Sequence, residues 1–421
     1  MRVGIFGAGI AGLAVAWFLR DDADVCVHEA SVGVGGLARS FKWHGFDCDL
    51  APHRFLTHDE ELLRQVLALV PMRRLERRSG IRLRGHWIRD PVNIFEVLYR
   101  FAPLESARIV WHYVVRRRQR EDSFEALVLN NYGKGLHDLF FKPYSEKLFG
   151  IPANEISPSW GRRKIRVSGL RDLVRRDPRL YFEHFYYPVE NGYGAIAERL
   201  YADVRTRVHL HSRLVGLAPL SSGGYECRFE TPTGVVSDRF DVVVSTLPMP
   251  ELGALLGFHI PLRFRPMTLL YLLVGVDSVS DRHWTYFADR DVIVNRVAEF
   301  RHFNANPPRG KTVICCEVTD AQQFSVERVI DELTGADFLP AGVPILDTKI
   351  IRLERAYPIY DRSYDEQIDL ARQAFAAHPG IFHIGRQAQF VHKDVDEILE
   401  EAKALASVMR PGSGRWPHVA P

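Results

Sequence analysis

A glycine-rich turn close to the start of the chain constrains the fold more than any other stretch. Residues 3–12 read VGIFGAGIAG, and small and apolar residues continue to Leu19. This order is typical of a buried parallel strand, a tight turn and a closely packed helix. We expect Gly7 to allow the turn, Gly9 to let backbone amides approach a pyrophosphate, and Gly12 to bring the helix close to the strand. The free N–H groups at the start of the helix would then face the phosphates.

An acidic residue follows the second expected strand. Residues 25–28 are suited to a buried strand, and Glu29 comes directly after them. A carboxylate at this position can accept hydrogen bonds from both ribose hydroxyls of an adenosine. Strand, glycine turn, helix and terminal acid together predict a Rossmann-type α/β domain that binds a dinucleotide, but they do not say which dinucleotide.

Composition excludes several other classes of protein. A formal net charge of +3 is too small to indicate a nucleic-acid partner. The five cysteines form no CxxC pair, so neither a metal site nor a disulfide framework is expected. No apolar run is long enough for a transmembrane segment, and a strand starting at residue 2 leaves no room for a signal peptide, so we expect a cytoplasmic protein. Two arginine-rich stretches, residues 72–90 and 114–122, favour a solvated face, with a membrane surface or an anionic ligand as the alternative.

The remaining patterns divide the 421 residues into interleaved parts. A second glycine turn at Gly35 and Gly36 is followed by a hairpin pattern at residues 41–50, and helical periodicity then dominates residues 92–133. Strand patterns dominate residues 263–355. We predict a cofactor domain built from residues 1–58, 187–260 and 356–410, a helical insertion at 59–186, a mixed or antiparallel β-sheet substrate domain at 261–355, and a flexible tail at 411–421.

Several segments together resemble a known group of proteins. The first glycine turn with Glu29, GVGGLARS at 33–40, DVVVSTLP at 241–248 and the strand–turn–helix at 384–402 are similar to FAD-binding proteins of the amine oxidase and protoporphyrinogen oxidase type. Within that superfamily the rest of the chain resembles UDP-galactopyranose mutase. The matching motifs are APHRF at 51–55, YSEKLFG at 144–150, NRVAEFRHF at 295–303 and AYPIYD at 356–361.

The resemblance implies FAD, bound by a GR2-like Rossmann domain. It places Glu29 on the adenosine ribose, Arg39 near the pyrophosphate, and the backbone around Leu214 at the adenine. The expected cofactor-binding residues are Gly7, Gly9, Ile10, Ala11, Gly12, Glu29, Ala30, Gly36, Leu37, Arg39, His53, Arg54, Leu214, Thr246, Gly385, Arg386, Asp394 and Val395.

At the flavin end, the resemblance places Gly385 and Arg386 beside the ring. The helix starting near Asp394 and Val395 would direct its positive end at the flavin and stabilise an anionic reduced form. His53 would lie in the turn on the reactive side of the flavin. A purely structural histidine is the alternative for His53.

For the substrate, the resemblance implies a nucleotide-diphosphate sugar and a redox-neutral exchange between pyranose and furanose forms. In those mutases N5 of the reduced flavin attacks the anomeric carbon, and two arginines stabilise the departing diphosphate. Arg296 matches one of them, with a salt bridge at a strand edge as the alternative. Arg163 matches the other more loosely, and the neighbouring Arg162 and Arg166 are alternatives for it.

Further matches assign Tyr144 and Phe149 to the nucleobase, with ordinary aromatic packing as the alternative, and Tyr357 to the diphosphate. His392 is expected near the substrate, where the family has a tyrosine. The expected catalytic residues are His53, Arg163, Arg296 and Tyr357.

Departures from the mutase motifs leave other functions open. Leu56 stands where the family has a second histidine, and Phe149 replaces a tryptophan. An FAD-dependent oxidase or desaturase of an amine, a porphyrin-like or an isoprenoid substrate is therefore the alternative, and a non-enzymatic FAD-binding protein is a third. A homodimer is also left open.

Overall fold

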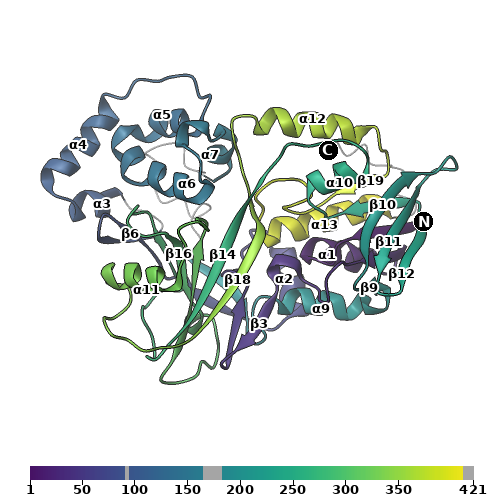
Figure 1. Cartoon of the computed structure of the whole chain (residues 1–421), viewed down its shortest axis with the longest axis horizontal. Helices are drawn as coiled ribbons and strands as arrows, with labels where there is room; N and C mark the ends of the chain where they lie inside the picture. Colours follow the sequence, from purple (N-terminus) through teal and green to yellow (C-terminus); the bar gives the residue numbers. More distant parts are fainter. Residues whose placement is uncertain (91–93, 165–182, 411–421) are drawn as a thin grey trace.

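Two sheets organise the chain, and the computed structural model describes residues 1–90, 94–164 and 183–410 (Figure 1). The tail predicted at 411–421 lies outside the described residues, as do parts of the predicted insertion at 91–93 and 165–182.

The first sheet is parallel and joins distant parts of the chain. Its order is β19-β13-β1-β2-β9, with bounds Ile381–His383, Val242–Ser245, Arg2–Phe6, Asp24–His28 and Val208–His209. The central strand β1 is almost fully buried, as its apolar sequence predicts. The Rossmann-type α/β prediction is therefore confirmed.

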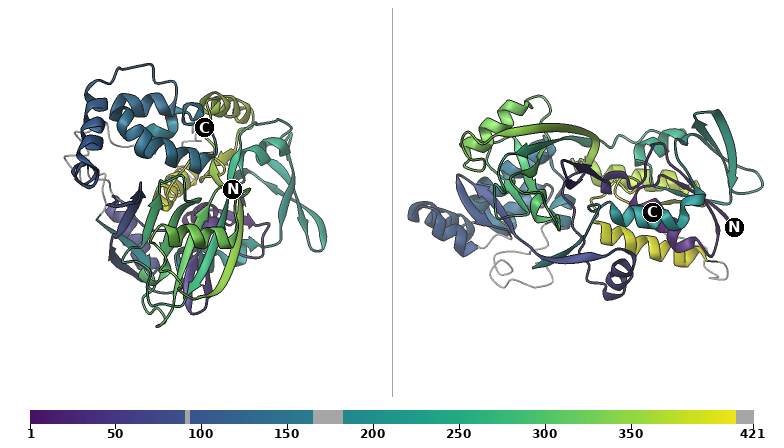
Figure 2. Two further views of the ribbon diagram at one scale, coloured as in Figure 1. Left: turned by 60° about the vertical axis from the view of Figure 1, so that its left-hand side comes forward. Right: turned by 90° about the horizontal axis from the view of Figure 1, so that it is seen from below.

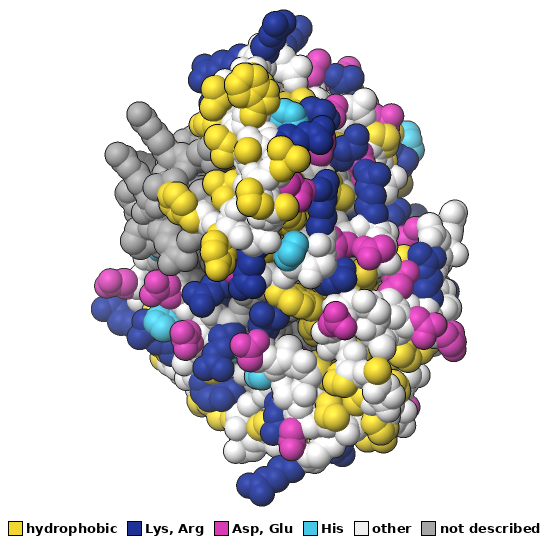
Figure 3. All heavy atoms as spheres, turned by 90° about the vertical axis from the view of Figure 1, so that its left-hand side faces the viewer, with side chains coloured by type: hydrophobic (Ala, Val, Ile, Leu, Met, Phe, Trp, Pro, Cys, Tyr) yellow, Lys and Arg dark blue, Asp and Glu magenta, His cyan; other side chains and the backbone are white. Residues whose placement is uncertain are grey.

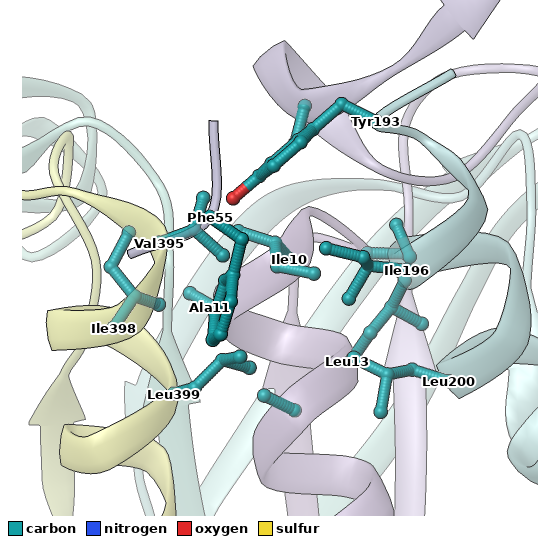
Figure 4. Packing of buried hydrophobic residues seen from close by; sticks show 14 of the residues in the cluster. Ile10, Ala11, Leu13, Phe55, Tyr193, Ile196, Leu200, Val395, Ile398 and Leu399 are labelled. Atoms are coloured by element: carbon teal, nitrogen blue, oxygen red, sulfur yellow. The ribbon is translucent and has the colours of Figure 1, made fainter. Parts of the chain in front are cut away.

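Helix α1 (Ile10–Leu19) packs between two helices that come much later in the sequence. Figure 4 shows Ile10, Ala11 and Leu13 of α1 between α9 and α13, which contribute Ile196 and Leu200 from α9 (Ala195–Val204) and Val395, Ile398 and Leu399 from α13 (Val395–Met409). Burial of each large aliphatic side chain stabilises the fold by about 1.5–3 kcal/mol. This packing fixes the start of α1, and with it the glycine turn.

The second sheet has seven strands and is antiparallel except where β15 meets β6. Its order is β18-β14-β17-β16-β15-β6-β7, with bounds Ile345–Pro358, Phe264–Val274, Thr312–Val318, Val294–Glu299, Trp284–Phe287, Ser79–Leu83 and His86–Arg89. Val329 and Leu333 of α11 (Val326–Gly335) cover one face of this sheet. The other face turns toward the parallel sheet.

Part of the predicted helical insertion is instead sheet. Strands β6 and β7 belong to the seven-stranded sheet, and β5 (Met72–Glu76) pairs with β8 (His184–Pro188). The arginine-rich sequence hides these strands because some of its arginines are buried in ion pairs. Arg82 is only 8% exposed and lies 2.6 Å from Asp289, so its stretch is not simply a solvated face.

Helices of the insertion gather at one end of the molecule, away from β10 (Arg213–Pro219), β11 (Tyr225–Thr231) and β12 (Gly234–Phe240), in all views (Figures 1 and 2). They are α3 (Ile94–Arg100), α4 (Pro103–Val114), α5 (Phe124–Leu136), α6 (Lys142–Phe149) and α7 (Pro158–Lys164). The remaining elements are the predicted hairpin β3–β4 (Ser40–Trp43, Phe46–Asp49), the sheet β10–β12 (Arg213–Pro219, Tyr225–Thr231, Gly234–Phe240), and α2, α10 and α12 (Glu60–Leu69, Met249–Leu255, Tyr364–Ala376). Within the described ranges, no helix combines the length and apolar character that a membrane crossing requires.

Candidate active site

A cavity of about 1170 Å³ runs between the two sheets. The glycine turns line one part of it, and β15, β16 and β17 line another. The volume exceeds that of a typical drug-sized pocket. The cavity therefore has room for a dinucleotide and a second molecule.

The three glycines of the first turn have different surroundings. A Cβ on Gly12 would lie 2.0 Å from the carbonyl oxygen of Gly7, and a Cβ on Gly7 would lie 2.2 Å from Oγ1 of Thr246. A Cβ on Gly9 would meet only Cα of Gly36, at 3.9 Å. Gly7 and Gly12 thus serve the packing of the chain, whereas Gly9 faces the open cavity.

The second glycine turn lies directly against the first. The amide of Gly35 donates to the carbonyl of Ala8 at 2.7 Å, and Nε of Arg39 donates to the carbonyl of Gly36 at 3.1 Å. Helix α1 has no side-chain cap and no acidic residue in its first turn. The two turns form one cradle whose free amides suit an anion.

Glu29 lies at the end of β2 and borders the cavity. Its Oε2 accepts a hydrogen bond from the amide of Ala8 at 2.7 Å, and its Oε1 accepts one from the amide of Ser31 at 2.8 Å. These bonds hold the carboxylate beside the glycine turn and leave it further lone pairs for a ribose.

We expect Glu29→Ala to weaken FAD binding by about 1.5–3 kcal/mol, because a charged hydrogen-bond acceptor is lost. The affinity can be measured by returning FAD to the apoprotein and following the flavin absorbance. The redox behaviour of the bound flavin should not change, since the resemblance assigns Glu29 to the ribose and not to the flavin ring. Unchanged affinity would mean that this carboxylate does not touch the cofactor.

The structure brings the other expected cofactor residues to the same cavity. Apart from Gly12, which packs behind the turn, all of them line it: Gly7, Gly9, Ile10, Ala11, Glu29, Ala30, Gly36, Leu37, Arg39, His53, Arg54, Leu214, Thr246, Gly385, Arg386, Asp394 and Val395. Helix α13 begins here with a capping box between Asp394 and Glu397. Asp396 follows in its first turn, where burial and the nearby Asp394 raise the pKa of its carboxyl group to about 7.

His53 lies in the turn that follows Asp49, a buried carboxylate. Its ring stacks on Tyr193 with centroids 5.1 Å apart. Asp49, which is fully buried, accepts hydrogen bonds from Ser40 at 2.6 Å and from Tyr187 at 2.9 Å. Burial, together with Arg386 and Arg296, lowers the pKa of His53 to about 3. His53 is therefore neutral at physiological pH.

Arg296 faces the cavity from the second sheet and pairs with Glu317. Its Nε lies 2.9 Å from Oε1 of Glu317, whose side chain is only 4% exposed. A salt bridge was the alternative expected for Arg296, but at the edge of a sheet. Strand β16 instead lies between β17 and β15, so the pair lies inside the sheet. Tyr286 stands opposite Arg296, with its ring centroid 5.9 Å from the guanidinium carbon.

Aromatic rings surround this ion pair. Tyr144 meets Tyr286 edge to face at 5.9 Å, and Tyr357 stacks on His392 at 5.8 Å. All four side chains line the cavity, so the predicted Tyr144, Tyr357 and His392 do converge with Arg296.

Two predicted substrate residues are not brought to the cavity. Arg163 donates to the carbonyl of His392 and lies 3.1 Å from Glu397, so it secures the segment that leads into α13. Phe149 is 1% exposed and packs against Trp160 at 4.9 Å. Its role is the packing named as the alternative. The contacts of Arg163 could not be predicted from motif spacing, because they are made with a segment more than two hundred residues away.

Arg54 is a cavity cation with no carboxylate partner among the described residues. Its guanidinium carbon lies 4.9 Å from the ring centroid of Trp284, and Arg77 approaches the same ring at 5.5 Å. Arg77 is paired with Asp90. Burial and the neighbouring Arg77 lower the pKa of Arg54. A charge in this setting favours the approach of an anion.

Sequence reasoning missed Trp284, Tyr286 and Glu317. One signal for Glu317 was present, since a charged residue inside the apolar run TVICCEV has to be paired if the strand is buried. Trp284 and Tyr286 stand two positions apart in β15, but nothing in the local sequence shows which face of this strand meets a ligand.

Comparison with known proteins agrees with this geometry. Residues 5–69 match the model of the NAD(P)-binding Rossmann-like domain. Protoporphyrinogen oxidase 1, chloroplastic, of Arabidopsis thaliana is 26% identical over 157 residues, which are 32% of this chain and only 29% of the plant protein.

Solved structures are similar over nearly the whole chain. A reduced UDP-galactopyranose mutase aligns with a TM-score of 0.82 at 20% identity, covering 96% of this chain and 94% of the mutase. A candidate protoporphyrinogen oxidase from Exiguobacterium sp. 255-15 aligns with a TM-score of 0.74 at 19% identity, covering 96% of this chain and 98% of that protein. The chain therefore shares its fold with these two proteins.

Proposed function

We propose that the protein is an FAD-dependent nucleotide-sugar mutase that interconverts pyranose and furanose forms without net oxidation. The observation that carries the proposal is the single cavity that joins the dinucleotide cradle to Arg296 and its ring of tyrosines. Similarity in fold to the reduced UDP-galactopyranose mutase supports the same assignment.

The residues present fit FAD. Gly9 leaves the cradle open where a Cβ would intrude, and Glu29 is held in place for a ribose. The start of α13 adds a positive helix end at the other part of the cavity. When bound in its reduced form, FAD would supply the nucleophile for a redox-neutral rearrangement of the sugar.

The chain's own side chains would bind and orient the substrate. We assign the diphosphate to Arg296 and Arg54, so that Arg54 takes the place expected for Arg163. Tyr144 would contact the nucleobase, and Tyr357 the diphosphate. Neutral His53 would position the sugar through a hydrogen bond and would add no charge, because its pKa lies far below physiological pH.

An FAD-dependent oxidase or desaturase is the second candidate, and specific observations favour it. Glu317 already neutralises Arg296, and Arg163 lies outside the cavity, so fewer cations remain for a diphosphate. The ring formed by Tyr144, Tyr286 and Tyr357 also suits an apolar or cationic substrate.

One experiment separates the candidates. The holoprotein is reduced with dithionite under argon and incubated with a panel of nucleotide sugars, and the products are separated by chromatography. We expect furanose formation without reoxidation of the flavin. In a second arm the oxidised holoprotein is offered amine, porphyrin-like and isoprenoid substrates, and reduction of the flavin by such a substrate without air, followed by its reoxidation by oxygen, would instead support the oxidase. If neither occurs with either class of substrate, the mutase proposal fails and an FAD-binding protein without turnover remains.

A further inference from the structure

The helices α3 and α4 expose an unusual concentration of large hydrophobic side chains. Seven of the sixteen such side chains exposed within the described ranges fall between residues 95 and 115. They are Phe95, Tyr99, Leu104, Val110, Trp111, Val114 and Val115, and we call them the α3–α4 surface. Tyr99 is 88% exposed, Leu104 84% and Trp111 63%. Figure 3 shows hydrophobic side chains gathered on this end of the molecule.

Helix α4 is apolar on two sides. Ile109 is 6% exposed and faces α5, where the backbones come so close that a Cβ on Gly135 would lie 2.7 Å from Cα of Ile109. Leu104, Trp111 and Val114 follow one another at helical spacing and point outward. The inner side fixes the helix to the protein, while the outer side is exposed and, within the described ranges, is not used for packing.

Arginines accompany the exposed apolar side chains. Residues 94–120 contain six arginines and two glutamates, and both glutamates are engaged, Glu96 with Arg100 and Glu105 with Arg84. Arg108, Arg117 and Arg118 are exposed and have no carboxylate partner within the part of the chain that the structure describes. Lys and Arg side chains also lie around the hydrophobic ones in Figure 3.

We propose that the α3–α4 surface docks on an anionic lipid surface, with α4 lying along the membrane interface. Exposed Trp and Tyr side chains prefer that interface, and unpaired arginines are attracted to anionic headgroups. Binding would be peripheral. The proposal takes up the alternative of a membrane surface for residues 114–122 in place of the solvated face, because the arginines there adjoin a large apolar surface.

The charges argue against a second copy of the chain as the occupant. In a two-fold dimer the same surface meets itself, so Arg108, Arg117 and Arg118 would face their own counterparts with few acids between them. Like charges at such an interface are costly. An anionic membrane supplies the missing counter-charge.

Vesicle sedimentation of the holoprotein tests the proposal. The probes are phosphatidylcholine vesicles with and without 30% phosphatidylglycerol, a composition we choose, at low and high salt. We expect binding to the anionic vesicles only, weakened by salt. Leu104→Ser/Trp111→Ser and Arg117→Gln/Arg118→Gln should each lower the vesicle affinity at least about tenfold. Val235→Ser/Val236→Ser, which alters exposed valines on β12, is the matched control and should bind like the wild type.

Bound FAD, read from the visible spectrum, shows that each variant is folded. Equal sedimentation of all variants, or no wild-type binding to anionic vesicles, would overturn the proposal. Light scattering tests whether a second copy of the chain covers the α3–α4 surface, because it measures the oligomeric state. If the wild type is a dimer and Leu104→Ser/Trp111→Ser is a monomer, the surface joins two copies and the lipid assignment is wrong.

Discussion

A Gly9→Val protein is expected to fold normally and to be purified without FAD, whereas the wild type should be yellow. The backbone at Gly9 has φ −68° and ψ 176°, an extended conformation that valine adopts without strain. Its side chain would point into the cradle, where only Cα of Gly36 lies within 4 Å. The variant therefore fills the space needed by a pyrophosphate. We expect FAD affinity to fall by about a hundredfold or more, equivalent to about 2.7 kcal/mol.

Gly12→Val is the matched control, because the same substitution three residues later is expected to disturb the fold and not the space for the cofactor. A Cβ there meets the carbonyl of Gly7 at 2.0 Å, and this backbone atom cannot move without disturbing the turn. We expect a loss of about 3 kcal/mol in the free energy of unfolding. Thermal denaturation of both apoproteins makes the comparison. A yellow Gly9→Val protein with wild-type affinity would show that the dinucleotide does not cross the first glycine turn.

The second large effect is expected at Arg296. Arg296→Ala should lower the free energy of unfolding by about 3–5 kcal/mol, because it leaves Glu317 buried and unpaired. Any variant that removes only the arginine is expected to lose this stability, because Glu317 stays buried. A loss of activity in such a variant would therefore not identify a catalytic role. Denaturant unfolding measures the stability change.

A double variant separates the two roles of Arg296. Arg296→Met/Glu317→Leu removes both charges and should recover most of the stability. If Arg296 also stabilises charge on the departing phosphate, turnover by the reduced enzyme should stay low, with the barrier raised by about 3 kcal/mol. Wild-type turnover in the double variant would assign Arg296 to structure alone and would favour the oxidase.

Local patterns were sufficient for the cofactor half of the site. The glycine turn and the capped start of α13 each depend on residues within a few positions of one another, and Glu29 directly follows its strand, so the local sequence predicts these elements. The hairpin β3–β4 was predictable for the same reason.

The substrate half depends on contacts between distant segments. The Arg296–Glu317 pair joins two strands. Simple alternation along β16 predicts that Val294 and Arg296 share a face of the sheet. The register is irregular between them, and the side chain of Val294 instead packs in the hydrophobic cluster on the opposite face. Arg163 matched the expected motif loosely, and its partners at His392 and Glu397 lie more than two hundred residues away. Neither helical nor strand periodicity in the sequence predicts these contacts.

The parallel sheet also has a consequence for how the protein is made. Strand β1 begins at Arg2, while β19 and α13, which complete the sheet and the cradle, are translated several hundred residues later. Synthesis proceeds from the N-terminus at about 5–20 residues per second, so the glycine turn emerges long before the elements that pack against it. During that interval the apolar faces of β1 and α1 have no permanent cover. Retention of the proposed FAD is thus expected to be a late event in biogenesis, and chains released before α13 are expected to lack it and to be exposed to proteases.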